Sequence, residues 1–552
     1  MNMEQSSEKG RWRQEQFCIQ KSQYGKYCAY GLLLLVIVFF AAVRFRLRAM
    51  PLERDEGEYA YIGHLMLQGI PPYKLAYTMK LPGTGAAYAG IMAIFGQTSA
   101  GIHLGLLMVN AVTTLLIYLL AVRLSGRLAG VVAAASYALV SAGVAILGLA
   151  AHATHFVVLF ALAGTMVLLK AMETERTWQF FMSGLLFGLA FLMKQPGIAF
   201  AAFGGSYLVA VEWKHPVAWK RLWLKVGSLG AGVLLPFGLT CLMLWAAGVF
   251  RTFWFWTFTY AREYASETAV SPGIRIFLGT FPAVMGPSAG VWMIAGFGVA
   301  SLVWHRESRR HAFLIASLSL WSFVALTAGL AFRDHYFILV LPAVALLAGI
   351  AVQSTTEALA ARSLAFAGVP VLLFAAACGY SVLKQAPFFL QMDPVTACEK
   401  RYGENPFPEA LAAAQYVEAH TSASDRIAVF GSEPEIYFYA RRHSATGFIY
   451  VYGLVEQQKY AFEMQKQMIS EIESVHPRFV VAVQDRLSWL ANTGSPELLS
   501  FSTWADHYLS EQYELAGLVE RVGERTECRW DNEIKNYQAR SQNVIGVFRR
   551  RN

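Results

Sequence analysis

Carboxylates and a lysine are grouped directly after the first apolar stretch of the chain. Residues 54–58 read Arg-Asp-Glu-Gly-Glu, and Lys80 begins the sequence Lys-Leu-Pro-Gly. A carboxylate can take the proton of an attacking hydroxyl as a new bond forms. A cation can stabilise the charge that develops on a leaving group such as phosphate. The segment therefore indicates group transfer to an alcohol, with Asp55 as general base, or alternatively Glu56, and with Lys80 at the leaving group.

Asp55 stands at the start of a predicted helix that ends near Gly69. From Glu56 onward, apolar residues recur at helical spacing, at Tyr59, Ile62, Leu65 and Met66. The pattern predicts a short amphipathic helix on the membrane surface. The alternative to catalysis is that Asp55 only caps this helix, with Glu58 three residues later completing a capping box.

Two more cations stand at the predicted ends of apolar stretches. Lys194 interrupts a long apolar run, and Arg333 lies between two later runs. Polar groups at the edge of a membrane are candidates for function, and several cations on one face suit a substrate that carries phosphate. We therefore expect Lys80, Lys194 and Arg333 to bind a phosphate group. The alternative is that such side chains only extend their charge from the membrane to water.

Two histidines have a spacing that can place two ligands on one metal ion. His152 and His155 are three residues apart, but the sequence shows no third ligand near them, and structural and catalytic metal sites usually have at least three. We therefore predict no metal site there. No cofactor is required by the pattern, and a role for a divalent cation is left open.

The composition is that of a membrane protein. Of the 552 residues, 56% are hydrophobic and 15% are charged, whereas soluble domains contain about 25% charged residues. The two apolar stretches at 179–193 and 196–212 are short for a bilayer of about 30 Å and could form one re-entrant pair. We predict an α-helical polytopic protein with about eleven transmembrane helices, at 28–47, 102–122, 128–149, 154–171, 179–193, 196–212, 225–247, 284–304, 312–331, 336–353 and 363–381.

Positive charge in the short loops predicts the orientation. Lysine and arginine are concentrated in the N-terminal tail 1–27 and in alternate loops, which places those segments in the cytoplasm. The net charge of +9 is then a consequence of topology, and nucleic acid is not an expected partner. The transmembrane domain spans 28–381, with its catalytic loop 49–100 outside. The expected location is the inner (plasma) membrane.

The chain becomes polar from about residue 382. Helical periods at 409–420 and 455–474 alternate with strand-like runs at 426–430, 478–483 and 544–548, which predicts a soluble, extracytoplasmic α/β domain over 382–552. Four prolines within 387–408 predict a linker. Cys398 and Cys528 are the two cysteines of this tail, and an oxidising compartment favours a disulfide between them over two free thiols.

The motifs resemble those of polytopic glycosyltransferases of the C superfamily. The pair Asp55-Glu56, the step Pro72-Tyr73, the sequence Lys80-Leu81-Pro82 and the later His335-Tyr336-Phe337 are similar to segments of protein O-mannosyltransferases, lipid A aminoarabinose transferases and related bacterial enzymes. The family often has Lys-Pro-Pro where this chain has Lys-Leu-Pro. The resemblance covers about residues 30–380.

The resemblance implies a donor sugar linked to polyprenyl phosphate and used at the outer face of the membrane. The aspartate of the pair, Asp55, is then the expected base, Lys80 holds the carrier phosphate, and His335 joins the phosphate site. The resemblance gives the tail no chemistry of its own. The acceptor is a lipid, a glycan or a protein.

We therefore interpret the chain as an inverting membrane glycosyltransferase. No glycine-rich nucleotide-binding loop occurs in the predicted cytoplasmic loops, which agrees with a donor that is already activated. The alternatives are a transporter or flippase for a lipid-linked glycan, and a glycan polymerase or ligase. The enzyme is favoured over a transporter because the carboxylates lie in an outside loop and because the chain shows no internal duplication of the transporter type.

Overall fold

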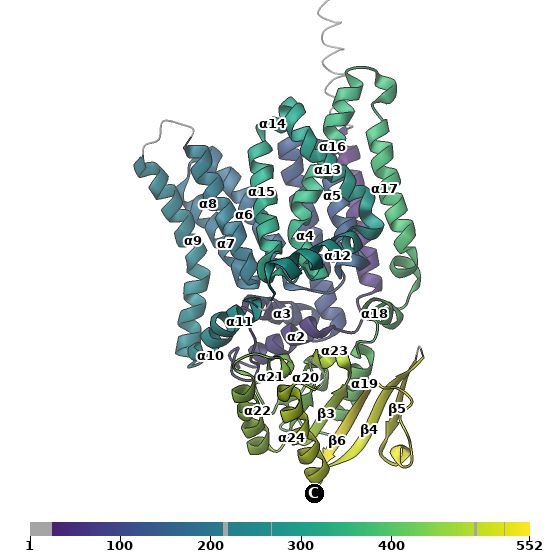
Figure 1. The fold of residues 1–552 in the computed structure, drawn as a ribbon. Coiled ribbons are helices and arrows are strands. Elements are labelled where there is room, and N and C mark those ends of the chain that lie inside the picture. Colours follow the sequence, from purple (N-terminus) through teal and green to yellow (C-terminus); the bar gives the residue numbers. More distant parts are fainter. Residues whose placement is uncertain (1–24, 214–218, 267, 491–493, 524, 552) are drawn as a thin grey trace, which may run out of the picture.

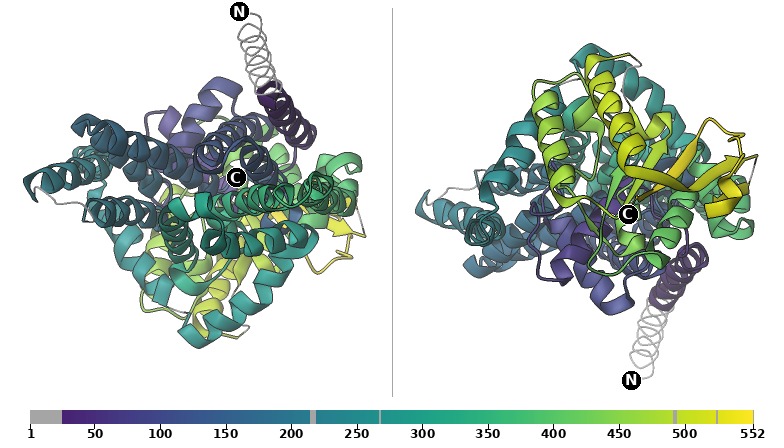
Figure 2. Two further views of the ribbon diagram at one scale, coloured as in Figure 1. Left: turned by 90° about the horizontal axis from the view of Figure 1, so that it is seen from above. Right: turned by 90° about the horizontal axis from the view of Figure 1, so that it is seen from below.

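The computed structural model describes residues 25–213, 219–266, 268–490, 494–523 and 525–551. Two parts are stacked along one axis: a helical bundle and a smaller α/β domain (Figure 1). Seen from below, the α/β domain lies across one end of the bundle (Figure 2). The predicted fold class, a helical membrane bundle with a C-terminal α/β domain, is confirmed.

Each of the eleven predicted apolar stretches contains a helix. By length and composition, seven helices of the described chain could cross a membrane, and four further apolar helices are shorter. The bundle consists of the first helix Gly25–Arg46, α4 Ser99–Ser125, α5 Arg127–Ser141, α6 Ala153–Thr174, α7 Thr177–Met193, α8 Ile198–Glu212, α9 Trp219–Ala246, α13 Ala289–Trp304, α15 Ala312–Leu326, α16 Leu341–Ala360 and α17 Val369–Ala386.

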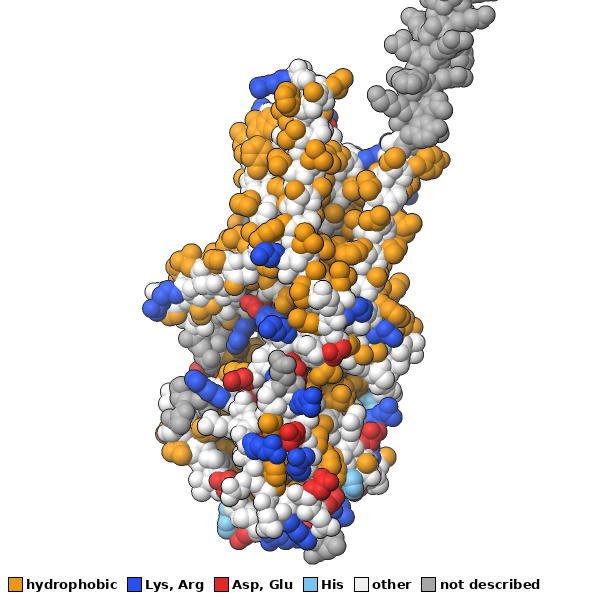
Figure 3. All heavy atoms as spheres, turned by 90° about the vertical axis from the view of Figure 1, so that its right-hand side faces the viewer, with side chains coloured by type: hydrophobic (Ala, Val, Ile, Leu, Met, Phe, Trp, Pro, Cys, Tyr) orange, Lys and Arg blue, Asp and Glu red, His pale blue; other side chains and the backbone are white. Residues whose placement is uncertain are grey.

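The bundle surface is apolar, whereas the α/β domain carries mixed charges (Figure 3). Large apolar side chains stand exposed along its helices, among them Leu234, Met243, Val303 and Leu372. A soluble monomer rarely exposes so much contiguous apolar surface. Lipid tails would cover it at no cost, so the surface is that of a membrane-embedded bundle.

The segments predicted to lie outside gather at the end of the bundle next to the α/β domain (Figure 1). The loop 49–100 folds into the predicted surface helix, α2 Arg54–Leu67, and an unpredicted apolar helix, α3 Gly83–Phe95. The long loop after α9 also folds into helices: α10 Phe250–Trp254, the π-helix η3 Phe255–Tyr260, α11 Ala261–Ser266 and α12 Val270–Met285.

The α/β domain is built on one six-stranded sheet in the order β2-β1-β3-β6-β4-β5. β1, β2 and β3 are parallel, and β6, β4 and β5 add antiparallel strands. The three predicted strands are correct, and β2, β4 and β5 were not predicted. The strands are β1 Arg426–Phe430, β2 His443–Ser444, β3 Phe479–Gln484, β4 Tyr513–Val522, β5 Arg525–Trp530 and β6 Val544–Arg550.

Helices pack around this sheet. The two predicted helical segments become α19 Phe407–Ala419 and α22 Ala461–Val475. Two helices between strands matter for the site described below: the short α20 Glu435–Ala440, which follows β1, and α23 Arg486–Trp489, which follows β3. The long α24 Pro496–Gln512 leads into β4.

The predicted linker and the predicted disulfide are both wrong. Residues 387–408 form the π-helix η8 Pro387–Gln391, α18 Pro394–Tyr402 and the start of α19. Their prolines stand in the first turns of these helices, where the missing N–H costs nothing. Cys398 lies on α18, fully buried in the core, and both it and Cys528 are free thiols. Burial raises the pKa of the Cys398 thiol well above its usual range, so it behaves as a small apolar side chain.

Candidate active site

The first turn of α2 is capped by a glutamate, not by the aspartate. The Glu53 carboxylate accepts a hydrogen bond from the Glu56 backbone N–H at 2.9 Å, and the Glu56 carboxylate accepts from the Glu53 N–H at 3.4 Å. This reciprocal pair is a capping box. The alternative in which Asp55 caps the helix with Glu58 is therefore wrong, and the Asp55 side chain is left for other contacts.

Glu56 is turned into the protein. Its side chain is wholly buried and pairs with His103 Nε2 at 3.0 Å while accepting from the Ala151 N–H at 2.6 Å. It is not among the residues that line the cavity described below. These contacts anchor α2 to the bundle, and they favour Asp55 over Glu56 as the group that meets a substrate.

Asp55 is paired with Lys80. Lys80 Nζ donates to Asp55 Oδ1 at 2.6 Å and also to the Glu58 carboxylate. Burial opposes the ionisation of Asp55, but the adjacent Lys80 ammonium outweighs it and holds the Asp55 pKa below its usual range. Burial likewise opposes the charge on Lys80, and the two carboxylates hold its pKa above the usual range. Asp55 and Lys80 therefore face the cavity as an ionised pair.

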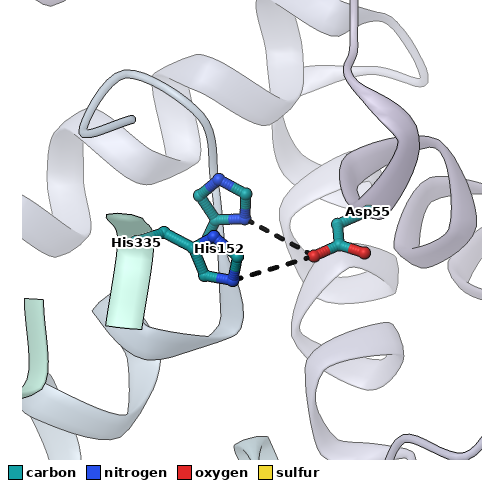
Figure 4. Close-up of side chains that lie close together, drawn as sticks. All are labelled: Asp55, His152 and His335. Atoms are coloured by element: carbon teal, nitrogen blue, oxygen red, sulfur yellow. Dashed lines mark ion pairs between the residues drawn. The ribbon is translucent and has the colours of Figure 1, made fainter. Parts of the chain in front are cut away.

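Two histidines from distant spans meet next to Asp55. His152 precedes α6 and His335 precedes α16, and their rings stack with centroids 3.9 Å apart. His152 Nδ1 and His335 Nε2 each lie 3.9 Å from Asp55 Oδ2 (Figure 4). His155, the sequence neighbour considered with His152, is not part of this group.

This group fits a metal ion. The candidate ligand atoms of Asp55, His152 and His335 lie within 4.8 Å of one another. Both ring nitrogens of His152 are buried without a hydrogen-bond partner in the described structure, and a buried polar atom without a partner is costly. Two imidazoles and one carboxylate are an ordinary ligand set for zinc and similar ions. The sequence does not reveal this group, because Asp55, His152 and His335 are far apart in the chain.

One cavity collects the predicted site residues. It has a volume of about 740 Å³, and Asp55, Lys80, Lys194, Arg333 and His335 all line it. Five residues spread over 280 positions of sequence are thus brought together, as expected from their predicted places at outer ends of helices. His335, placed by the resemblance alone, is part of the same wall.

The cations of the cavity differ in what they contact. Lys80 is engaged by two carboxylates. Lys194 lies with its Nζ 3.8 Å from the centre of the Tyr336 ring, and the salt bridges of the described residues include none for it. A partly buried ammonium over an aromatic face that forms no salt bridge with a carboxylate is able to bind an anion.

The α/β domain supplies one wall of the cavity. Phe448, Tyr450 and Tyr452 line it opposite the bundle residues, with Tyr402 and Phe407 nearby. Lys80 Nζ is 5.7 Å from the centre of the Tyr450 ring. The tail therefore contributes side chains to the cavity wall, although the resemblance assigns it no chemistry of its own. The alternation of aromatic residues in Gly447–Gly453 was the available signal, because alternate side chains of an extended segment share a face.

Comparisons with known proteins agree with this architecture. Residues 80–260 match the family model described as dolichyl-phosphate-mannose-protein mannosyltransferase. No curated protein sequence matches the chain.

Two solved proteins share the fold over nearly the whole chain. ArnT from Cupriavidus metallidurans, solved bound to undecaprenyl phosphate, has a TM-score of 0.56 at 16% identity over 94% of this chain and 97% of that one. Its apo structure has a TM-score of 0.55. The archaeal oligosaccharyltransferase AglB from Archaeoglobus fulgidus, in complex with an inhibitory peptide and a dolichol-phosphate, has a TM-score of 0.50 at 12% identity over 93% of this chain and 75% of that one. The chain therefore has the fold of the C-superfamily glycosyltransferases, which confirms the resemblance.

Proposed function

We propose that this protein is a membrane glycosyltransferase that moves a sugar from a polyprenyl-phosphate donor to a hydroxyl group of an acceptor. The observation that carries the proposal is the ionised Asp55 in a cavity that also holds Lys80, Lys194 and Arg333. A base and a phosphate site side by side are what such a transfer needs. The solved relatives that bind undecaprenyl phosphate or dolichol-phosphate support a lipid carrier.

The proposed reaction is a single displacement with inversion. The acceptor oxygen attacks the anomeric carbon of the sugar, and the bond from that carbon to the phosphate oxygen breaks. The acceptor proton passes to Asp55, and the bond electrons leave with the polyprenyl phosphate. Only one carboxylate is needed because the leaving group is already stable as an anion.

We assign the first contact with the donor phosphate to Lys194 and Arg333. Lys80 is paired with Asp55 and Glu58, whereas Lys194 lies over the Tyr336 ring and has no salt bridge among the described residues. A phosphate bound by Lys194 lies near enough to compete for the Lys80 ammonium. As Lys80 turns toward the phosphate, its hold on Asp55 weakens and Asp55 becomes a stronger base.

A divalent cation has a place in this cavity. Asp55, His152 and His335 would hold it, and when bound it would supply positive charge toward the donor phosphate. His335 would then serve the phosphate through the ion rather than through its own proton. Metal analysis of the purified protein, before and after chelation, decides between the two roles, and retention of transfer by the metal-free protein excludes an essential ion.

The proposed location is the plasma membrane, with the catalytic cavity and the α/β domain on the extracytoplasmic side. The loop arginines and lysines support this orientation, and the segments expected outside all lie at the end of the bundle that bears the cavity. A reporter that is active only outside the cytoplasm should be active when fused after Gln391. Activity of a cytoplasmic reporter at that position would invert the assignment.

Measuring the release of free polyprenyl phosphate distinguishes a glycosyltransferase from a transporter. The purified protein in nanodiscs is given polyprenyl-phosphate sugars together with candidate lipid, glycan and protein acceptors. A glycosyltransferase releases free polyprenyl phosphate in step with the glycosylated product. A flippase leaves every donor intact while moving it between leaflets, so reconstituted vesicles that move donor without releasing the carrier would refute the proposal.

A further inference from the structure

The α/β domain grips the turn of α2 that carries Asp55. Arg54, its sequence neighbour, reaches into the domain with all three guanidinium nitrogens. Nε donates to the Ser432 carbonyl at 2.6 Å, and Nη1 donates to Asn405 Oδ1 at 3.2 Å. Nη2 pairs at 2.7 Å with Glu433, whose side chain is fully buried. Such a fork fixes direction as well as charge.

Three more contacts fasten the same turn. The Leu52 N–H donates to the Tyr439 hydroxyl at 2.7 Å. The Tyr450 hydroxyl lies 2.9 Å from the Arg54 carbonyl oxygen and 3.4 Å from Asp55 Oδ1. The absent side chain of Gly57 lets α20 approach closely, because a Cβ there would lie 2.5 Å from a backbone nitrogen of α20. Residues 52, 54, 55 and 57 are thus all held from the α/β side.

The bundle side alone does not account for this arrangement. The capping box of Glu53 and Glu56 closes the helix, and Glu56 ties it to the bundle. Neither contact reaches the Asp55 carboxylate. Within the described structure, that carboxylate is approached by Lys80 and the two histidines from the bundle side and by the Tyr450 hydroxyl from the other.

We propose that the α/β domain is a working part of the catalytic apparatus, because its grip on Arg54 and the Tyr450 hydroxyl set the position of Asp55. This inference rests on the proposed function, in which Asp55 is the base. Tyr450 and Arg54 are positioning residues, since both act through Asp55. A displacement of about 1 Å at a reacting group can lower a rate by about a hundredfold, so a second domain that fixes the base has a direct effect on turnover.

The kinetic test removes one hydroxyl at a time. Tyr450→Phe keeps the ring and loses both contacts with α2. The matched control is Tyr513→Phe, which loses a buried hydrogen bond to the Pro477 carbonyl at 2.8 Å inside the α/β domain. A hydrogen bond that orients Asp55 and contributes about 1.4 kcal/mol to the activation free energy corresponds to roughly a tenfold change in kcat. We expect this decrease in Tyr450→Phe with an unchanged KM for the donor, and an unchanged kcat in Tyr513→Phe.

The second test does not depend on activity. Arg54→Lys keeps the positive charge beside Glu433 but cannot make the other two contacts. Hydrogen exchange of the full-length protein in nanodiscs reports the backbone amides of residues 52–58. We expect exchange there to accelerate by about tenfold in Arg54→Lys, whereas the amides of α3 keep their wild-type rates.

The results separate this inference from the proposed function. Equal kcat in Tyr450→Phe and wild type, or unchanged exchange of residues 52–58 in Arg54→Lys, overturns the positioning role. If the wild-type protein releases no polyprenyl phosphate with any donor, the proposed function fails, and the exchange data alone then decide whether the α/β domain holds α2. A fall in kcat equal in Tyr450→Phe and Tyr513→Phe assigns the effect to domain stability and also overturns the role.

Discussion

Replacing Asp55 by asparagine separates catalysis from structure in this site. The Asp55→Asn change keeps the size of the side chain and an oxygen that accepts from Lys80, but it removes the charge and the basicity. The Asp55 side chain is 27% exposed, against 2% for that of Glu58. An acceptor that entered the cavity would therefore meet Asp55 before Glu58, which is the buried partner of Lys80.

The structure sets the expected size of both effects. Breaking a buried ion pair costs about 3–5 kcal/mol when one charge is left alone. Here Lys80 keeps Glu58 as a partner. Asp55→Asn should therefore lower the free energy of unfolding by about 1.5–3 kcal/mol, the range of a single hydrogen bond to a charged group. The loss of general-base help should lower turnover by about 10²–10⁴-fold, which corresponds to about 3–5 kcal/mol of activation free energy.

The assay is single-turnover release of polyprenyl phosphate, measured with donor binding and thermal unfolding on the same preparation. Glu58→Gln is the matched control because it removes the other partner of Lys80. We expect both variants to fold and to bind donor, with a rate loss below about tenfold for Glu58→Gln. Near-normal turnover in Asp55→Asn would refute the general-base role. Equal rate losses in the two variants would show that disturbance of Lys80, rather than loss of a base, is the cause.

Three further predictions concern separate parts of the molecule. Gly57→Ala should lower the rate of transfer by about tenfold or more, because the added Cβ pushes α20 away from α2. The control is Gly90→Ala on α3, where a Cβ meets nothing within 4 Å; it should preserve transfer and stabilise the fold by up to about 1 kcal/mol. Equal rates of transfer in the two variants would contradict the role of the close approach at Gly57. Burial lowers the pKa of Lys194 to about 7, so the ammonium is present below that pH. The affinity for polyprenyl phosphate should therefore fall by about tenfold between pH 6 and 8. Lys194→Arg stays charged and should abolish this pH dependence, and an identical pH profile in the variant would exclude Lys194 from the phosphate site. Cys398 and Cys528 should both be alkylated after denaturation of non-reduced protein, and a peptide containing both, joined by a disulfide, would contradict the structure.

Much of the fold was accessible from the sequence because its signals are local. An apolar stretch long enough for a bilayer identifies its helix without knowledge of its neighbours. The three predicted strands are short, apolar and β-branched, and two of them lie in the centre of the sheet. β4 and β5 were missed because they carry charged residues, such as Glu520 and Arg525, and their pairing with each other and with β6 decides their conformation.

The errors at the start of α2 have a similar cause. Aspartate is a common N-cap and glutamate is not, so propensity favoured Asp55 as the cap. In the structure Glu53 is the N-cap residue, because its carboxylate accepts from the Glu56 backbone N–H and the Glu56 carboxylate accepts from the Glu53 backbone N–H. The stacking of His152 on His335 was equally inaccessible, since it depends on how α6 and the segment before α16 pack across the bundle.

Lys80 makes contacts that the sequence does not predict, and its role as a phosphate ligand stays a prediction. Its type and place next to Leu-Pro-Gly predict a phosphate ligand, and the structure places it between two carboxylates instead. The two roles are compatible if the ammonium is shared. Without donor, Lys80 keeps Asp55 ionised but weakly basic, because a carboxylate with a depressed pKa is a poor proton acceptor. In the proposed mechanism, a donor phosphate that draws the ammonium away would return basicity to Asp55 when the sugar is in place. The base would then be strong only in the presence of the donor, and the lysine that weakens it in the free protein would stabilise the leaving group during transfer.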